Sequence, residues 1–326
     1  MKRRGALFGI LGLGAGLISA RSASAQPAAK APVIGLLDAG ARLEWWAAFR
    51  QEIQKLGYVE GRNVAFETRF AGGKQEMLPA LAQDLVRLDV TMIVTSGTAA
   101  ALEAKRATGK IPIVTASGSD HVSQGLAISL ARPGRNVTGL TSITTGLTVK
   151  RFDLLREVFP KMSRLAVVWH ADNIGSVPAV RDLETAVVSS KISLQNYGVS
   201  TVKELIDAFS TAARERVDAV FVIAGPFTYS ERGRLAELAL KYRLPTMHGP
   251  SEYVEAGGLL CYAPSYPELF RHAAVYVDKI LKGAKPGDLP IEQPTKFELV
   301  INLKSAKALG VTIPQTVLLR ADRVID

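Results

Sequence analysis

Apolar runs of strand length alternate with segments of helical periodicity along most of the chain. The runs, bounded by turn residues, predict strands at Val33–Leu37, Asn63–Phe70, Val90–Val94, Ile111–Thr115, Leu165–Trp169, Ala219–Ile223, Pro245–His248, Gly258–Tyr262 and Phe297–Ile301. The periodic segments predict helices from Trp46 to Leu56 and over Gln75–Leu88, Ala99–Thr108, Leu147–Phe159, Val177–Ser189, Thr201–Arg214, Arg232–Tyr242 and Glu268–Leu281. Strands that alternate with helices predict parallel sheets covered by helices.

The elements fall into two series of similar size, and the second begins after Gly146. Two such series predict two α/β lobes with a cleft between them. The Pro/Gly-rich stretch Lys282–Pro294 is typical of a connection between lobes. We expect the first lobe to comprise residues 32–142 and 265–288, and the second lobe to comprise residues 143–264 and 289–326.

The first residues have the pattern of an export signal rather than of the globular part. Lys2, Arg3 and Arg4 precede an uncharged apolar run, and small residues at Ala23 and Ala25 suit a signal peptidase. The run is short for a membrane span. We therefore expect residues 1–25 to be a cleaved signal peptide and the remaining chain to be exported, without insertion into the membrane.

Composition and charge narrow the class of protein. Cleavage of the signal would lower the net charge from +10 to +6, and the remaining Lys and Arg form no block, which argues against nucleic acid as a partner. Cys261 is the single cysteine, so an internal disulfide is impossible, and no cysteine follows the signal to carry a lipid anchor. These features indicate a globular exported protein.

Hydroxyl-rich turns follow two predicted strands of the first series. One contains Ser96, Gly97 and Thr98, and the next contains Ser117 and Asp120. Ligands of open parallel sheets bind beyond the carboxyl ends of strands, where helix N-termini favour anions. The sequence thus predicts an anion-binding turn at residues 96–98, although helix capping alone would also use one such hydroxyl.

Other candidate ligand-binding residues also lie near strand ends. They are Asp38 after the first strand, Asp120 as a partner for an ammonium or hydroxyl group, Asn173, Phe227 and His248 in the second series, and Tyr262 as a stacking surface. Trp45 is a further stacking candidate, whereas Trp46 shares the apolar face of its helix and is expected in the core.

Nucleotide, metal and catalytic motifs are missing from the sequence. There is no phosphate-binding GxxxxGK[ST] run, and no GxGxxG motif follows the first strand. His121, His170 and His248 lack the spacing of a zinc site, and polar lining of the cleft is the expected role for them. Neither GxSxG nor HExxH occurs, and Cys261 is expected to be a small buried side chain. We expect neither a cofactor, nor a metal, nor an enzymatic activity.

Several longer segments resemble one known family. They are LGYVEGRNV (56–64), ATGKIPIV (107–114), SLARPGRNVTGL (129–140), EAGGLLCYAPS (255–265) and the block from Tyr276 to Pro314. Together they resemble the substrate-binding proteins of ABC importers of the tryptophan/tyrosine type, from about residue 32 onward. Two cleft-facing positions depart from the usual pattern of that family: His121 stands where proline is usual, and Ala263 where glycine is usual.

The resemblance implies the type I periplasmic-binding-protein fold, with two Rossmann-like lobes joined by a three-stranded hinge. It implies a periplasmic protein, expected to be a monomer, that delivers a small ligand to a membrane permease and its ATPase. It also implies that the Ser96-Gly97-Thr98 turn holds a ligand carboxylate. An amino acid is the expected ligand, and aromatic side chains are favoured, while aliphatic amino acids and small carboxylic acids stay open.

Two other functions use the same cleft. An exported sensor would feed a membrane receptor instead of a permease, and an exported enzyme would convert the bound compound. Neighbouring genes for a permease and an ATPase would favour transport over sensing, and turnover of the ligand would favour an enzyme.

Overall fold

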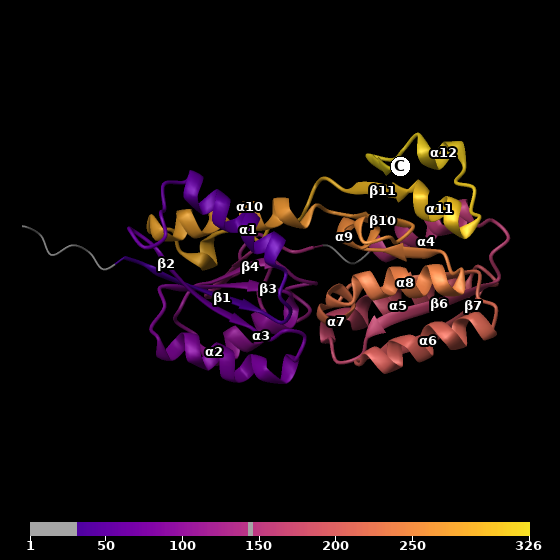
Figure 1. Cartoon of the computed structure of the whole chain (residues 1–326). Helices are drawn as coiled ribbons and strands as arrows, with labels where there is room; N and C mark the ends of the chain where they lie inside the picture. Colours follow the sequence, from indigo (N-terminus) through magenta and orange to yellow (C-terminus); the bar gives the residue numbers. More distant parts are fainter. Residues whose placement is uncertain (1–30, 143–145) are drawn as a thin grey trace, which may run out of the picture. The chain divides into compact units, whose positions relative to one another are not determined.

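A computed structural model describes residues 31–142 and 146–326 of the chain. The expected signal peptide, residues 1–25, lies outside the described residues. Two β-sheets, each with helices on both faces, form the fold (Figure 1). No helix in the described part of the chain combines the length and the hydropathy that a membrane span requires.

The first sheet is entirely parallel, with strand order β2-β1-β3-β4-β5. Its strands are β1 (Val33–Asp38), β2 (Ala65–Phe70), β3 (Met92–Ser96), β4 (Ile113–Ser117) and β5 (Val137–Gly139). Its helices are α1 (Leu43–Lys55), η1 (Gln75–Met77), α2 (Leu78–Arg87), α3 (Thr98–Ala107) and, from later in the chain, α10 (Tyr266–Leu281) and η3 (Pro286–Asp288). We call these elements the first lobe.

Alternation along the strands divides the core of the first lobe between two faces. Ile34 and Leu36 of β1 join a cluster with Phe49 of α1 and residues of α10, whereas Leu37 joins a cluster with Leu85 of α2 and residues of α3. Because successive side chains of a strand point to opposite faces, a strand buried on both sides is apolar throughout. This explains why continuous apolar runs, rather than alternating ones, mark β1, β3 and β4.

The second sheet has the order β12-β11-β10-β9-β8-β6-β7. Its strands are β6 (Arg164–His170), β7 (Ser193–Val199), β8 (Ala219–Val222), β9 (Thr246–His248), β10 (Leu260–Ala263), β11 (Glu298–Asn302) and β12 (Arg323–Ile325). Its helices are α4 (Leu147–Val158), η2 (Ile174–Ser176), α5 (Val177–Val188), α6 (Val202–Arg214), α7 (Pro226–Ser230), α8 (Arg232–Tyr242), α9 (Ser251–Glu255), α11 (Leu303–Leu309) and α12 (Gln315–Leu318). We call these elements the second lobe.

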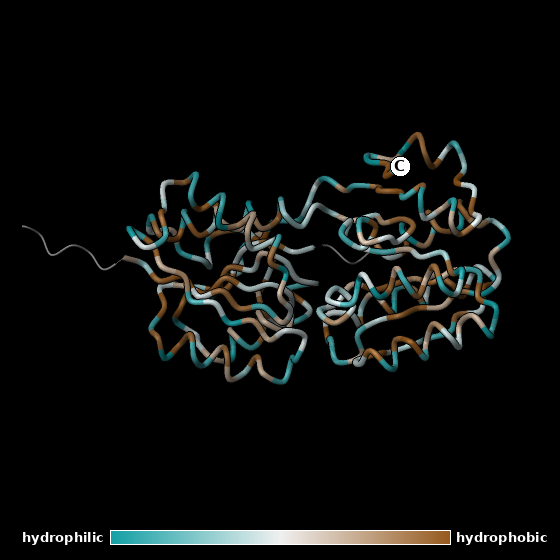
Figure 2. The backbone as a smooth tube through the Cα atoms, in the orientation of Figure 1, coloured by the Kyte–Doolittle hydropathy of each residue, from teal (hydrophilic) through white to brown (hydrophobic). Residues whose placement is uncertain are grey.

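The second lobe is packed in the same way as the first. Val167 of β6 contributes to a cluster with α4, α5, α11 and α12, and its neighbour Val168 contributes to a cluster with α6 and α8. The long helices alternate between hydrophobic and hydrophilic residues, as expected of helices with one face on a sheet (Figure 2). The predicted parallel order needs one correction, because β11 runs antiparallel to β10.

The chain returns to the first lobe after β10 and leaves it again before β11. Helix α10 packs against α1 and β4, and the hydroxyl of Tyr58 donates to Asp278 at 2.9 Å. The following segment runs beside β5, where the amide of Glu292 donates to the carbonyl of Gly139 at 2.9 Å. Residues 289–292, which we expected in the second lobe, therefore hydrogen-bond with the first lobe.

Candidate functional site

Both sheets have a point at which the strand order reverses, and these two points carry the candidate site. In the first sheet β2 and β3 flank β1, and in the second sheet β7 and β8 flank β6. Loops that leave the carboxyl ends of such strands diverge to opposite faces of the sheet and open a crevice, which is where ligands bind in open α/β sheets.

A cavity of about 100 Å³ is lined by these loops from both lobes, and we call it the interlobe cavity. The first lobe contributes Ala39, Arg42, Trp45, Ser96, Gly97, Thr98, Ala99, Ser117, Gly118, Ser119 and Tyr266. The second lobe contributes Leu147, Arg151, Asn173, Gly175, Ala179, Ile223, Ala224, Gly225, Pro226, Tyr229 and Pro250, and Ser142 lies on the crossing between the lobes.

The predicted hydroxyl turn lies in this lining at the start of α3. Gly97 has φ +87°, in the left-handed region that favours glycine, and the first turn of α3 has no side-chain cap. The free amide groups of this turn and the positive end of the helix are suited to an anion. The hydroxyl of Thr98 is engaged by Ser119, at 2.8 Å to its Oγ and 2.9 Å to its amide.

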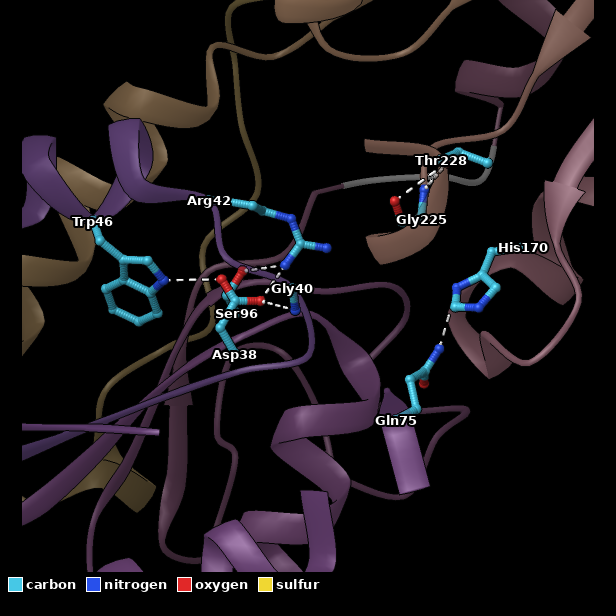
Figure 3. Close-up of polar contacts among 9 residues, drawn as sticks. All are labelled: Asp38, Gly40, Arg42, Trp46, Gln75, Ser96, His170, Gly225 and Thr228. Atoms are coloured by element: carbon cyan, nitrogen blue, oxygen red, sulfur yellow. Dashed lines mark hydrogen bonds and ion pairs between the residues drawn. The ribbon is translucent and has the colours of Figure 1, made fainter. Parts of the chain in front are cut away.

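Asp38 and Arg42 form a buried ion pair beside the cavity (Figure 3). Asp38 also accepts hydrogen bonds from the amide of Gly40 at 2.8 Å and from the indole of Trp46 at 2.9 Å. The same Arg42 nitrogen lies 3.2 Å from the hydroxyl of Ser96. Asp38 is fully buried and does not line the cavity, but it holds the guanidinium of Arg42, which does.

Arg151 of α4 brings a second buried cation to the cavity. Its side chain is 9% exposed, and Nε donates to the carbonyl of Tyr262 at 2.6 Å. Within the described residues no carboxylate forms an ion pair with it. Burial lowers the pKa of this guanidinium, but an arginine does not lose its proton in a protein. The positive charge is therefore available to a ligand.

Aromatic rings form another wall of the cavity. Trp45 stacks on Tyr266 with centroids 4.3 Å apart and meets Tyr229 edge-on at 4.8 Å. The guanidinium carbon of Arg42 lies 5.3 Å from the centroid of Trp45. Flat, polarisable surfaces next to cationic donors suit a ligand with a planar apolar part and an anionic group.

Side chains of the two lobes also touch around the cavity. The hydroxyl of Tyr229 donates to Glu44 at 2.6 Å, the indole of Trp45 donates to Glu252, and Gln75 lies 3.5 Å from the imidazole of His170 (Figure 3). These contacts join α1 and η1 to α7, α9 and β6, so they form only when the lobes approach each other.

Of the residues proposed from the sequence, Ser96, Gly97, Thr98, Ser117 and Asn173 line the interlobe cavity. Asn173 serves its own loop as well, because its amide donates to Ser176 at 2.8 Å.

Five other proposed residues do not line the cavity: Asp38, Asp120, Phe227, His248 and Tyr262. Asp120 is exposed and accepts from the amides of Val122 and Ser123 in its own loop. His248 is buried, stacks on Tyr253, and has its pKa lowered to about 3 by burial and by Arg151. Phe227 packs near His170 instead.

Tyr262 stacks on Phe297, with ring centroids 5.7 Å apart, and offers its backbone carbonyl to Arg151. Its ring lies in a separate groove together with Glu298 and Arg323. The aromatic rings that line the cavity are those of Trp45, Tyr229 and Tyr266 instead.

Arg42, Arg151, Tyr229 and Tyr266 line the cavity but were not expected there. Arg42 lies in the loop that follows the first strand. The rule that ligands bind beyond the carboxyl ends of strands would have found Arg42 if it had been applied to every residue of that loop. Arg151 lies within a helix next to Lys150, and this pattern is typical of a solvated face. Only the packing of α4 against the sheet shows that it is buried.

The remaining polar candidates have structural roles. His121 is fully buried between the carbonyl of Ser119 and the hydroxyl of Thr115, both at 2.8 Å. Burial raises the pKa of the Cys261 thiol to about 12, so it stays protonated. In the part of the chain that the structure describes, no three metal-binding side chains are grouped.

Comparison with known proteins identifies the family. Residues 30–325 match the family described as ABC transporter substrate binding protein. The chain belongs to this family. A tyrosine-binding protein of Clostridioides difficile (strain R20291) is 25% identical over 263 residues, which are 81% of this chain and 75% of that protein.

Solved structures of similar proteins have the same fold as this substrate-binding protein. A conserved domain protein from Vibrio cholerae has a TM-score of 0.84 and 26% identity, and an ABC domain from Streptococcus pneumonia in complex with L-Trp has a TM-score of 0.83 and 23% identity. Each match covers 90% of this chain and 100% of the other. The predicted fold class, two α/β lobes of the periplasmic-binding-protein type, is confirmed.

Proposed function

We propose that this chain is the exported binding component of an ABC importer and that it captures a small carboxylate-bearing solute in the interlobe cavity. It would release the solute unchanged to a membrane permease driven by an ATPase, on the outer side of the cytoplasmic membrane. Membership of the substrate-binding family supports this role, and the signal-like first residues support export.

The observation that carries the proposal is the charge of the cavity. Arg151 is buried, borders the cavity and has no carboxylate partner among the described residues. A buried charge without a partner is unfavourable. An anionic ligand that pairs with this guanidinium offsets that cost, and this contributes to the free energy of binding. The uncapped start of α3 and the hydroxyl of Ser96 add donors for the same anion.

The aromatic wall supports a ligand with a planar apolar part. Tyr266 is the partly exposed ring of this wall and can pack against an aromatic ring, and the relatives are named for tyrosine and for a complex with L-Trp. The cavity volume is below the range of about 300–1,000 Å³ for drug-sized ligands. Ligands of that size would therefore hold the lobes farther apart. Aromatic amino acids and the corresponding carboxylic acids are the first compounds to test.

Binding in such a cleft shifts an equilibrium between an open form, in which the lobes are separated, and a closed form, in which the lobes approach each other; we call the latter the approached form. A ligand favours the approached form because only there do Arg42 and Arg151, from different lobes, contact it together. Contacts from both lobes therefore contribute to affinity as well as to the change of shape.

A thermal-shift screen followed by titration calorimetry tests the proposal. We expect at least one amino acid or carboxylic acid to bind, and we expect Arg151→Gln to weaken its binding by roughly ten-fold or more. Lys150→Gln removes the same charge from an exposed neighbour on α4 and serves as the control. If no carboxylate-bearing compound bound, or if the bound compound were converted to a product, the proposed function would be wrong.

A further inference from the structure

The charges around the interlobe cavity indicate the net charge of the ligand as well as the presence of a carboxylate. Resting on the proposed function, we propose that the ligand is an organic acid anion that carries no ammonium group, rather than a zwitterionic amino acid.

Among the residues that the structure describes, the lining of the cavity contains two cations and no acidic side chain. Arg42 and Arg151 are its charged members, and its other polar side chains are the hydroxyls of serine, threonine and tyrosine, the indole of Trp45 and the amide of Asn173. Residues 143–145 are Ile-Thr-Thr and so contribute no carboxylate by their composition. A ligand ammonium would find hydroxyls and carbonyls there, but no opposite charge.

The carboxylate nearest to the first cation is already fully engaged. Asp38 is 0% exposed, and its two oxygens accept from Arg42, Gly40 and Trp46. Asp38 and Arg42 thus neutralise each other. Since Asp38 does not reach the cavity surface, it cannot pair with a ligand ammonium without giving up a buried hydrogen bond.

Within residues 31–142 and 146–326, Arg151 has no such partner. Nε is fixed on the carbonyl of Tyr262, and the side chains that oppose the lowering of its pKa are Tyr266, Cys261, Tyr253 and Tyr262, none of which is a carboxylate. The neighbouring His248 has its pKa lowered to about 3 and is neutral as well. The cavity therefore carries one uncompensated positive charge, which a monoanion balances and a zwitterion does not.

Carboxylates outside the lining are turned to other partners. Glu252 is 9% exposed and accepts from the indole of Trp45, and burial raises the pKa of its carboxyl, which favours the uncharged form. Glu44 accepts from Tyr229 and Arg232. Asp120 accepts from amides of its own exposed loop, and Asp172 is exposed, 3.9 Å from His170. An ammonium buried in the cavity would thus lose water without gaining an ion pair, which is unfavourable.

Calorimetric titration of matched pairs separates the two classes. Phenylalanine is compared with 3-phenylpropanoate, tyrosine with 3-(4-hydroxyphenyl)propanoate, and leucine with 4-methylpentanoate, because the members of each pair differ only in the ammonium group. For the pair that binds, we expect the acid to bind at least roughly ten-fold more tightly than the amino acid. We expect Arg151→Gln to reduce this ratio several-fold, and Lys150→Gln to leave it unchanged.

The outcomes distinguish this inference from the function on which it rests. If an amino acid bound as tightly as its acid or more tightly, the proposed function would stand and the inference would be overturned. If no member of any pair bound, nor any other acid or amino acid of the wider screen, the proposed function itself would fail. An unchanged ratio in a folded Arg151→Gln protein would overturn the role given to Arg151.

Discussion

The buried pair of Asp38 and Arg42 shows how one residue positions another at the site. Asp38 does not touch the cavity, yet three donors converge on its carboxylate, and one of them is the guanidinium that does line it. Removal of one member of a buried ion pair leaves an uncompensated charge, which destabilises a protein more than the intact pair stabilises it.

Asp38→Asn is therefore expected to lower the free energy of unfolding by about 3 kcal/mol, measured by urea denaturation. Asp84→Asn is the matched control, because Asp84 pairs with Arg87 at the surface, where the side chains are 36% and 74% exposed. That change is expected to cost less than about 1 kcal/mol. Equal losses in the two variants would contradict the structural role given to Asp38.

The buried imidazole of His121 is expected to make the free energy of unfolding depend on pH. Burial lowers the pKa of its imidazole from the usual 6.5 to about 4, while Ser119 and Asp120 partly oppose that shift. Between those values the unfolded chain binds the proton and the folded chain does not. This contribution to stability is therefore present above pH 6.5 and is lost as the pH falls toward 4.

The variant His121→Gln removes this titration. From pH 7 to pH 4.5, the free energy of unfolding is expected to fall by about 2 kcal/mol more in the unchanged protein than in the variant, measured by urea denaturation at both pH values. His272→Gln is the control, since His272 is exposed and pairs with Glu292 near the surface. A parallel pH dependence of the His121 variant and the unchanged protein would contradict the buried neutral imidazole.

Strand-end reasoning located part of the site but not its charges. Ser96 ends β3 and Thr98 comes two residues later, directly after the apolar run 92–94, so their place at the carboxyl edge could be predicted. Asp120 follows the next strand but lies farther along its loop, where the backbone turns the carboxylate away. A carboxylate several residues beyond a strand end can face either solvent or ligand, and the local sequence pattern does not show which of the two it faces.

At the scale of elements, the strands buried on both faces could be predicted and the exposed or short elements could not. Strand β7 lies at one edge of its sheet and carries Gln195 and Asn196, so it has no apolar run to mark it. Strands β5 and β12 and helices α7, α9, α11 and α12 are too short for a periodicity to be detected. Predicted ends generally fell within two or three residues of the observed ones, the precision usual for helix and strand boundaries.

Strand β5 contains a glycine, Gly139, that has no room for a side chain. Gly139 has φ +120°, and a Cβ at this position would lie 2.3 Å from the carbonyl oxygen and 2.6 Å from the amide nitrogen of Thr115 on β4. Both are backbone atoms, so no side-chain rotation relieves the clash. An added methyl group would separate β4 from β5 next to the crossing between the lobes.

Gly139→Ala is therefore expected to destabilise the protein by about 3 kcal/mol or more, measured by urea denaturation. Gly57→Ala provides the comparison, because Gly57 also has a positive φ, +94°, but no atom lies within 4 Å of its Cβ position. It is expected to cost about 1 kcal/mol, the backbone strain alone. The prediction fails if both variants lose the same stability.

At the scale of the whole molecule, contacts between the lobes affect ligand affinity, because they stabilise the form in which both lobes reach the ligand. Glu44 of α1 accepts from Tyr229 at 2.6 Å and lies 3.2 Å from Arg232, and it does not line the cavity. These bonds stabilise the approached lobes without touching the ligand. Any ligand that requires the approached form benefits from them to the same extent.

Glu44→Gln is therefore expected to weaken binding of every ligand by a similar factor, about five-fold for the loss of about 1 kcal/mol. This uniform loss differs from the selective loss expected for Arg151→Gln, because Arg151 lines the cavity and Glu44 does not. Calorimetry measures the affinities, and small-angle X-ray scattering measures whether the ligand-free variant has a larger radius of gyration.

Glu215→Gln is the matched control for that experiment. Glu215 also accepts from a tyrosine hydroxyl, that of Tyr197 at 3.1 Å, but both residues belong to the second lobe. It is expected to leave affinity and radius of gyration unchanged, because its bond persists whether or not the lobes approach. An equal effect of the two variants, or a loss in Glu44→Gln confined to one ligand class, would show that the lobe-bridging bonds do not control the approach of the lobes.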